Sequence, residues 1–147
     1  MAQLLDVAID TKLKLCALWA SIMFCLIVSE HIALFTPGTF EMMKSFRSDP
    51  EHRDSLRAAA LMMASPILMI FLSVALPAKY NRILNIVAGL SFVLFWALST
   101  LVISMLASVG NITLTISAPK ILQFAAVTFA TLVVWYAWKW PKTQNAV

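Results

Sequence analysis

Glu30 and His31 form an adjacent ionisable pair near the end of the first long apolar run of the sequence. A carboxylate at the centre of a bilayer costs about 2.5–3.5 kcal/mol on insertion scales, and less near the interface. Such a group therefore faces a helix bundle, pairs with another polar group, or takes up a proton and stays neutral. Imidazole titrates near neutral pH. The pair is accordingly a candidate site for a proton, a cation or a polar ligand headgroup.

Partners for Glu30 have to come from other helices, because consecutive residues of one helix point about 100° apart and His31 cannot face it. The candidates lie near the ends of the other apolar runs: Arg57, Ser104, Ser108, Lys120 and Gln123. A structural salt bridge or hydrogen bond to one of them is the alternative to an ion or ligand site. Catalysis needs a second positioned acid or base, and none is identified. The other histidine, His52, lies between the first two apolar runs and not beside Glu30 in the sequence. The sequence therefore predicts no catalytic residue, no metal site and no cofactor.

Four long apolar runs must position these residues. The chain is 61% hydrophobic and 12% charged, with a mean hydropathy of +0.86, which is outside the range of soluble domains. About 20 apolar residues in a helix cross roughly 30 Å of hydrocarbon. The runs at about 13–35, 56–76, 83–107 and 119–140 come close to that length or exceed it. The sequence therefore predicts an all-α integral membrane protein, a four-helix bundle that forms a single transmembrane domain over residues 1–147.

A short amphipathic helix is expected between the first and second spans, at residues 40–47. Thr39 is a suitable N-cap for it. The segment places three large apolar side chains opposite two charged ones, namely Phe40, Met43 and Phe46 opposite Glu41 and Lys44. This pattern is typical of a helix that lies on the membrane surface.

Small and amide side chains recur every four residues on two of the spans. The first set is Ser21, Cys25 and Ser29, and the second is Asn81, Asn85 and Gly89. Lipid offers little hydrophobic drive for helix association, so residues of these types at this spacing predict faces where helices pack closely. Cys16 and Cys25 are nine positions apart, about 13 Å along a helix, so they cannot form a disulfide within one chain.

Basic residues gather at the ends of the spans. One side would hold Lys12, Lys14, Lys79, Arg82, Lys139 and Lys142, and the other Lys44, Arg47, Arg53, Arg57 and Lys120. The positive-inside rule applied to these six and five residues places both termini in the cytoplasm. The net charge of +4 favours contact with anionic lipid headgroups over nucleic acid, because the chain has no basic patch interleaved with aromatic residues.

Several segments together carry a family resemblance. They are Ile22-Met23-Phe24, Glu30, Pro37-Gly38, Pro66 with Met69, Leu72-Ser73, Asn81-Arg82, Asn85-Ile86, Ala88-Gly89 and Trp135-Tyr136-Ala137-Trp138-Lys139. On these residues the chain resembles, over nearly its whole length, an uncharacterised family of small bacterial four-helix membrane proteins, a domain of unknown function with a layout similar to DoxX-like proteins. The resemblance implies the four-helix fold and favours a role for Glu30, where the family has an acid.

The family pattern also differs from this chain at two places. It often has an acid two positions before the mid-span proline and an arginine just beyond the Leu-Ser pair, where this sequence has Ala64 and Val74. If that pair carries the family's function, this chain has lost it or does something else. The family has no agreed activity, so the resemblance implies a fold and no particular reaction.

Three classes of function are consistent with these observations. The first, which we expect, is a non-catalytic component of a bacterial inner membrane that binds lipid, a small hydrophobic ligand or a partner membrane protein, or assembles as a homo-oligomer. The second is an oligomeric channel or transporter subunit that uses Glu30 as the ion or proton site, since four helices rarely enclose a pore alone. The third is a membrane-embedded enzyme, for which a second ionisable group in the bilayer would be expected.

Overall fold

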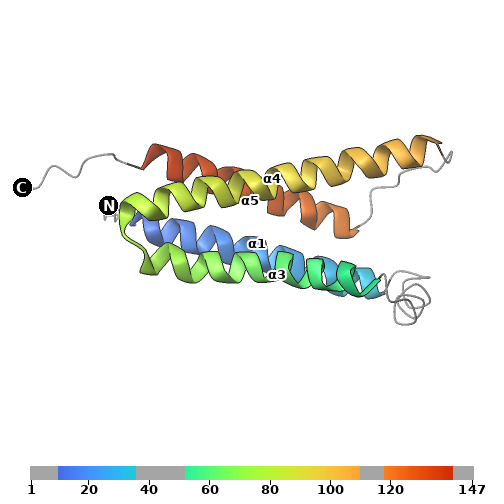
Figure 1. The fold of residues 1–147 in the computed structure, drawn as a ribbon, viewed down its shortest axis with the longest axis horizontal. Coiled ribbons are helices and arrows are strands. Elements are labelled where there is room, and N and C mark those ends of the chain that lie inside the picture. The colour runs from blue at the N-terminus through green and yellow to red at the C-terminus, as the bar shows by residue number, and fades with distance from the viewer. Residues whose placement is uncertain (1–9, 36–51, 110–117, 141–147) are drawn as a thin grey trace, which may run out of the picture.

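The computed structural model describes residues 10–35, 52–109 and 118–140, which form four helices. They are α1 (Thr11–Leu34), α3 (His52–Ala75), α4 (Ala78–Val109) and α5 (Ala118–Lys139), shown in Figure 1. The prediction of an all-α four-helix bundle is thereby confirmed. The interfacial helix predicted at residues 40–47 lies outside the described residues.

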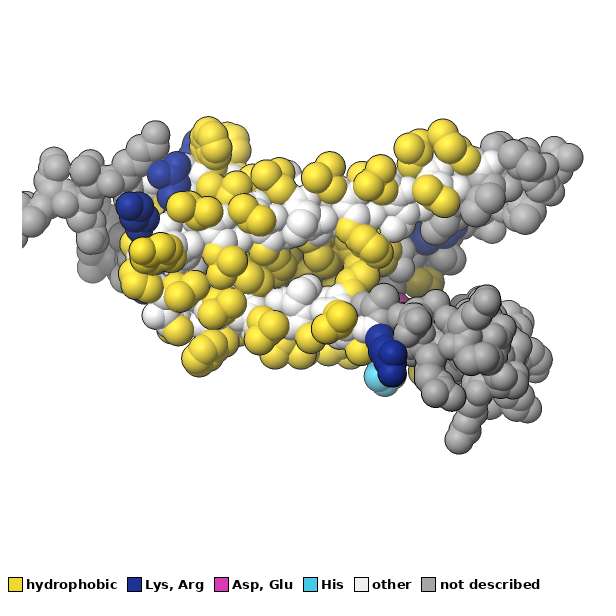
Figure 2. All heavy atoms as spheres, viewed as in Figure 1, with side chains coloured by type: hydrophobic (Ala, Val, Ile, Leu, Met, Phe, Trp, Pro, Cys, Tyr) yellow, Lys and Arg dark blue, Asp and Glu magenta, His cyan; other side chains and the backbone are white. Residues whose placement is uncertain are grey.

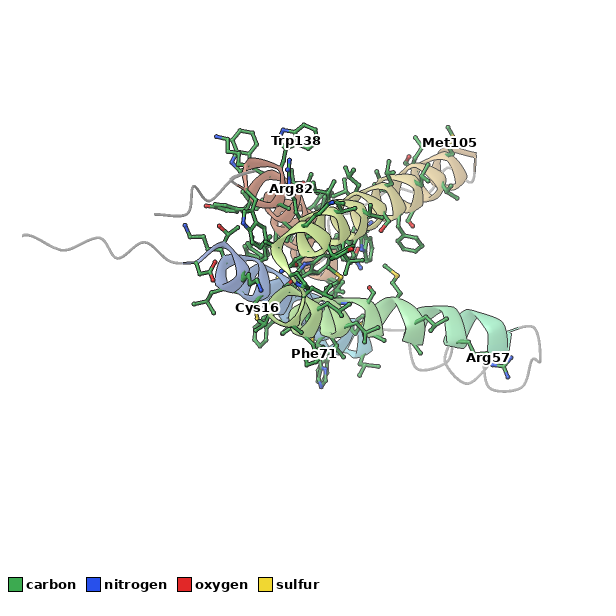
Figure 3. All side chains as sticks on the ribbon, turned by 60° about the vertical axis from the view of Figure 1, so that its left-hand side comes forward. Cys16, Arg57, Phe71, Arg82, Met105 and Trp138 are labelled. Atoms are coloured by element: carbon green, nitrogen blue, oxygen red, sulfur yellow. The ribbon has the colours of Figure 1, made fainter. Side chains whose placement is uncertain are left out.

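The helices pack in the spatial order α3, α1, α5, α4. Helix α1 lies between α3 and α5, and α5 lies between α1 and α4. Helices α3 and α4 follow each other in sequence, yet they contact each other least among these packed pairs. From the turn at Pro77 they diverge, as Figure 3 shows by the separation of Arg57 on α3 from Met105 on α4.

Three of the helices are long and apolar enough to cross a membrane: Thr11–Leu34, Ala78–Val102 and Pro119–Lys139. The apolar part of α3, Ala60–Ala75, is shorter. At 1.5 Å per residue its 16 residues extend about 24 Å, against roughly 30 Å of hydrocarbon. Length and composition therefore show a multi-pass membrane protein with three candidate spans and a shorter apolar helix beside them.

The start of α4 differs from the prediction. The sequence predicts that the third span begins at about residue 83, whereas the helix begins at Ala78. The backbone N–H of Asn81 donates to the carbonyl of Pro77 at 3.0 Å, so the helical hydrogen bonds start directly after the proline. Hydropathy detects where side chains become apolar, and the polar first turn of a helix is invisible to it.

A compact core joins α1 and α5. The buried apolar residues of α1 recur at helical spacing, namely Leu15, Trp19, Ile22 and Leu26, and those of α5 are Ala126, Ala130, Val133 and Ala137. Three alanines on one face of α5 let the neighbouring backbones approach closely, which is the packing that membranes favour. At the far end of this interface the Ser29 hydroxyl donates to the carbonyl of Pro119 at 3.2 Å and ties α1 to the first turn of α5.

The outward faces of the helices are apolar. Figure 2 shows hydrophobic side chains along the visible face between the two ends, with lysine and arginine side chains near both ends. The most exposed members include Phe24, Leu61, Phe71, Leu94 and Leu98. A soluble monomer rarely exposes a contiguous apolar patch above a few hundred Å², so this surface belongs in lipid.

Candidate functional site

A buried network of polar side chains joins α1, α3 and α4 close to the turn at Pro77. Asn85 lies at its centre, where its Oδ1 accepts a hydrogen bond from the Trp19 indole Nε1 at 2.7 Å and another from the Ser73 hydroxyl at 3.2 Å. Its Nδ2 donates to the Asn81 carbonyl at 2.8 Å and to Asn81 Oδ1. Asn81 Nδ2 in turn donates to the backbone carbonyl of Ser73. Ser73, Asn81 and Asn85 are fully buried.

Every hydrogen-bonding position of the Asn85 amide has a partner in this network. An unpaired amide in the hydrocarbon region would cost several kcal/mol, so the closed arrangement makes a buried polar cluster tolerable in a membrane helix bundle. None of its four side chains titrates near neutral pH. The network therefore fixes the turn between α3 and α4 against α1, and it offers no acid, base or metal ligand for chemistry.

Directly beside the network, α3 and α4 leave a cleft of about 260 Å³. Its lining comes from three helices: Trp19 of α1, Met62, Ser65 and Met69 of α3, and Ala88, Ser91, Phe92 and Phe95 of α4. The Trp19 ring meets Phe92 edge to face, with centroids 6.4 Å apart. Figure 2 views the face between α3 and α4, where the surface is hollowed and lined with apolar side chains.

The chemistry of the cleft is apolar and adaptable. Both of its hydroxyls are engaged by their own helices, since Ser65 donates to the carbonyl of Met62 at 2.8 Å and Ser91 to that of Ala88 at 2.9 Å. Methionine side chains are unbranched and polarisable, and they adjust to occupants of different shape. Small-molecule clefts have volumes of about 300–1,000 Å³. A cleft slightly below that range suits a chain segment or a single ring, with the remainder of the molecule in the bilayer.

Trp96 follows Phe92 by one turn of α4 and is not among the residues that line the cleft. Its ring contacts two of the lining aromatic residues, with centroid distances of 6.3 Å to Phe92 and 6.0 Å to Phe95. The indole nitrogen is buried and has no hydrogen-bond partner among the described residues. A buried donor without an acceptor costs about 1–3 kcal/mol.

Glu30 and His31 are both exposed, close to the C-terminal end of α1. Glu30 makes no ion pair or hydrogen bond within the part of the chain that the structure describes. Of its predicted partners, Arg57 is exposed, Ser104 bonds to the carbonyl of Leu101 at 2.8 Å, Lys120 and Gln123 are half-buried, and the side chain of Ser108 is not described. No group of three metal-ligating residues occurs over the described ranges. The structure thus does not bring these candidates together.

The residues predicted to pack between helices occupy different environments. Cys25 and Ser29 on α1 are buried, and so are Asn81 and Asn85 on α4, whereas Ser21 is half-buried and bonds to the carbonyl of Ala17 at 2.9 Å. At Gly89 an added Cβ would lie 2.7 Å from Val134 Cγ2. The glycine therefore sets how closely α4 approaches α5.

Sequence reasoning missed two members of the polar network and the cleft itself. Trp19 and Ser73 carry no signal of pairing, because a tryptophan and a serine inside a span are common residues and their partner is 66 and 12 positions away. The cleft depends on the angle between two helices, which no local pattern encodes. Trp96 was equally invisible, since burial of its nitrogen follows from the three-dimensional arrangement.

Cations and aromatic rings cluster at the end of the bundle that holds the α3–α4 turn. Arg82 donates through Nε to the carbonyl of Ala137 and through Nη2 to that of Trp138, both at 3.2 Å, and so caps the last turn of α5 (Figure 3). The ammonium of Lys139 lies 4.1 Å from the centroid of the Trp135 ring. Such basic and aromatic residues anchor a protein at the headgroup level.

The chain matches no protein-family model, and comparisons with curated proteins and with solved structures return no match either. The resemblance to DoxX-like membrane proteins therefore stays a prediction.

Proposed function

We propose that this multi-pass membrane protein is a non-catalytic binding protein, which takes the apolar part of a molecule from the lipid phase into the cleft between α3 and α4. The observation that carries the proposal is the cleft itself: about 260 Å³, lined by Trp19, Met69 and Phe92 among others, and open at the exposed Phe95. An apolar cleft that opens sideways exchanges its occupant with the bilayer and not with water.

The rigidity of one cleft wall supports this function. Trp19 contributes its ring to the cleft, while its indole nitrogen is held by Asn85 of the polar network. A preorganised wall lowers the ordering cost of binding. The opposite wall, on α3, supplies methionine side chains that can adapt to the occupant.

A photoreactive alkyl probe tests the proposal directly. The full chain in nanodiscs is irradiated with a long-chain hydrocarbon that bears a diazirine, and the labelled residues are mapped by mass spectrometry. We expect saturable labelling at Met62, Met69 and Phe92, several-fold above that of the lipid-facing Phe71 and Leu94. Uniform labelling that does not saturate would show that lipid solvates the cleft like any other surface, and it would refute the proposal.

Two alanines on α4 provide a matched pair of variants. Ala88 lines the cleft, whereas Ala97 is exposed and lies nine positions further along, which is half a turn away on the helix. Ala88→Phe should fill the cleft and abolish the saturable labelling, and Ala97→Phe should leave it unchanged. Equal effects of the two variants on the saturable labelling would contradict the assignment of the binding site to the cleft.

We further propose a bacterial inner membrane location with both termini in the cytoplasm. The start of α1, the α3–α4 turn and the end of α5 lie at the same end of the bundle (Figure 1), and this end holds Lys12, Lys14, Lys79, Arg82 and Lys139. The sequence places six basic residues on this side of the membrane against five on the other, and this difference supports the orientation. Labelling of Lys79→Cys in sealed inverted and right-side-out vesicles tests it, because only the inverted vesicles should expose the thiol; Cys16→Ala and Cys25→Ala in the same chain remove the native thiols.

The channel hypothesis and the enzyme hypothesis both require further polar or ionisable side chains close to Glu30. No contact among the described residues supplies them, so we rank both below the binding protein. Ion flux through proteoliposomes compared between the wild type and Glu30→Gln tests the channel hypothesis. Loss of flux in a correctly folded Glu30→Gln protein would favour it over the binding proposal.

A further inference from the structure

We infer that the outward face of α1 is the contact surface for a second copy of this chain, in a parallel dimer in which Glu30 of each copy pairs with His31 of the other. This face goes beyond the proposed binding function, because it lies on the outer side of α1 and the cleft lies between α3 and α4. Glu30 and His31 are exposed, and neither forms a hydrogen bond or an ion pair with the residues that the structure describes.

The exposed residues of α1 form one stripe along the helix. Helix α1 packs against α3 and α5, and its buried residues fill the side toward these two neighbours. Apart from Glu30, its exposed residues from position 17 onwards follow one another at alternate steps of three and four. They are Ala17, Ala20, Phe24, Ile27, His31 and Leu34. Steps of this size keep side chains on one face of a helix, so the outer stripe is continuous and no described helix covers it.

The spacing of the outer stripe is the a and d pattern of a coiled coil. In a coiled coil, each a or d side chain of one helix fills a hole formed by four residues of the facing helix. The pattern assigns His31 to an a position and Glu30 to the g position directly before it. In a parallel pair the hole for an a side chain includes this g residue of the facing helix, so the imidazole of one copy lies against Glu30 of the other.

The outer stripe is therefore complementary to a copy of itself. Copies of one membrane protein insert with the same orientation, so a two-fold axis runs along the membrane normal and residues at equal depth meet. The Glu30 carboxylate accepts a hydrogen bond from a ring N–H of His31, a donor that imidazole carries in both of its protonation states. The two-fold axis forms this pair twice, and an acid and a base that have no described partner within one copy are matched between two.

Depth in the membrane favours a second copy over lipid as the occupant of this face. Glu30 lies 16 positions after Lys14, which is at the entry of the span. At 1.5 Å per residue this is about 24 Å, and roughly 6 Å short of the opposite edge of a hydrocarbon layer about 30 Å thick. Lipid tails offer no donor to a carboxylate, and acids inside a membrane pair with other polar groups. Nearer the other end of the stripe, Ala17 and Ala20 let two backbones approach closely.

Cysteine cross-linking of the full chain in membranes tests the surface. Cys16→Ala and Cys25→Ala remove the native thiols, and Ala17→Cys or Ala20→Cys then places one thiol on the outer stripe. Ala97→Cys, at an exposed alanine of α4, is the matched control. Because a disulfide requires Cα atoms within about 7 Å, mild oxidation should link either stripe variant into a dimer and leave the control monomeric. Equal cross-linking of all three variants, or no dimer from the stripe variants, would overturn the inference.

Two charge variants test the pairing of Glu30 with His31. Glu30→His places two imidazoles at this level of each copy and His31→Glu places two carboxylates, so neither variant can form the pair with itself. The dimer Kd, measured by energy transfer between labelled copies in liposomes, should rise about tenfold for each variant alone. An equal mixture of the two variants should dimerise like the wild type, because each contact then joins an imidazole and a carboxylate. Variants as tight as the wild type, or a mixture that does not recover, would overturn the inference.

Two further results separate this inference from its alternatives. If a charge variant does not fold, cross-linking through the outer stripe of the otherwise unchanged protein still decides. A monomer in native mass spectrometry, with a bound phospholipid that Glu30→Gln releases, would assign the face to a lipid headgroup and overturn the dimer. Saturable labelling of the cleft is expected in the monomer and the dimer alike, so failure of the dimer would leave the proposed binding function standing.

Discussion

The two ends of the α3–α4 pair differ in how their buried polar groups are hydrogen-bonded. Near the turn the helices are held together by Asn85, which pairs the Trp19 indole and the Ser73 hydroxyl. Away from the turn they diverge, and the Trp96 indole is buried without an acceptor. Two buried indole groups therefore differ in a single hydrogen bond, which Trp19 makes and Trp96 lacks. The comparison suggests that the closed end acts as a clamp, which lets the other end stay open to the bilayer without loss of the fold.

Asn85→Ala should have the largest effect on stability, because it removes the centre of the clamp. The substitution leaves Trp19 Nε1, the Ser73 hydroxyl and Asn81 Oδ1 without their partner. Unpaired buried groups cost about 1–3 kcal/mol each, but hydrogen bonds in membrane proteins average only about 0.6 kcal/mol in double-mutant cycles. We expect a loss of about 2–4 kcal/mol in the free energy of unfolding, measured by titration with a denaturing detergent.

Ser99→Ala is the control for this experiment, since Ser99 donates only to the carbonyl of Phe95 in its own helix. Its unfolding free energy should stay within about 0.5 kcal/mol of the wild type. If Asn85→Ala proves as mild as Ser99→Ala, the network is no clamp, and the contrast between the two ends disappears.

Gly89→Ala examines how the α4–α5 contact contributes to the closed end. The new Cβ would lie 2.7 Å from Val134 Cγ2, so the helices must separate or the valine must move. Overpacking costs about 1–3 kcal/mol, and alanine regains about 1 kcal/mol through its higher helix propensity. We expect a net destabilisation of about 1 kcal/mol in the same unfolding assay. In a protein that already carries Val134→Ala, Gly89→Ala should increase the free energy of unfolding. If it still destabilises that protein, the new Cβ clashes with a residue other than Val134.

Arg82→Gln should have a similar or slightly smaller effect, through the loss of the cap on α5. The guanidinium donates to the carbonyls of Ala137 and Trp138, which are left without helical partners at the end of the helix. We expect a destabilisation of about 0.5–1.5 kcal/mol and faster amide hydrogen exchange over the last turn of α5. Lys79→Gln, at an exposed position of the same end, should leave both measurements unchanged. An equal response of the two variants would mean that net charge matters and the cap does not.

Hydropathy and spacing predicted the four-helix membrane fold because each helix carries its own signal in its own apolar run. They also indicated Asn81, Asn85 and Gly89, since small and amide residues in a span are unusual enough to be noticed. The predicted start of α4, at about residue 83, lies C-terminal to the observed start at Ala78, because the first turn of the helix is polar.

The candidate site was much less predictable. Glu30 attracted attention as a carboxylate beside lipid, yet the structure leaves it exposed near the end of α1, away from the cleft. The cleft consists of ordinary membrane residues such as Met69 and Phe92, whose significance arises from the divergence of two helices. That angle is set by long-range contacts, including the bond from Trp19 to Asn85 over 66 positions, and a local pattern contains no information about them.

The smallest expected effect is that of Trp96→Phe in protein without ligand, and it sharpens the comparison most. Phenylalanine keeps most of the aromatic contact with Phe92 and Phe95 and removes the unpaired N–H, so the loss of volume and the relief of an unsatisfied donor nearly cancel. We expect a change within about 0.5 kcal/mol in the free energy of unfolding, whereas Trp19→Phe should lose about 1–3 kcal/mol because it also breaks the bond to Asn85. Equal destabilisation by the two substitutions would mean that the Trp96 indole also has a hydrogen-bond acceptor in the folded protein.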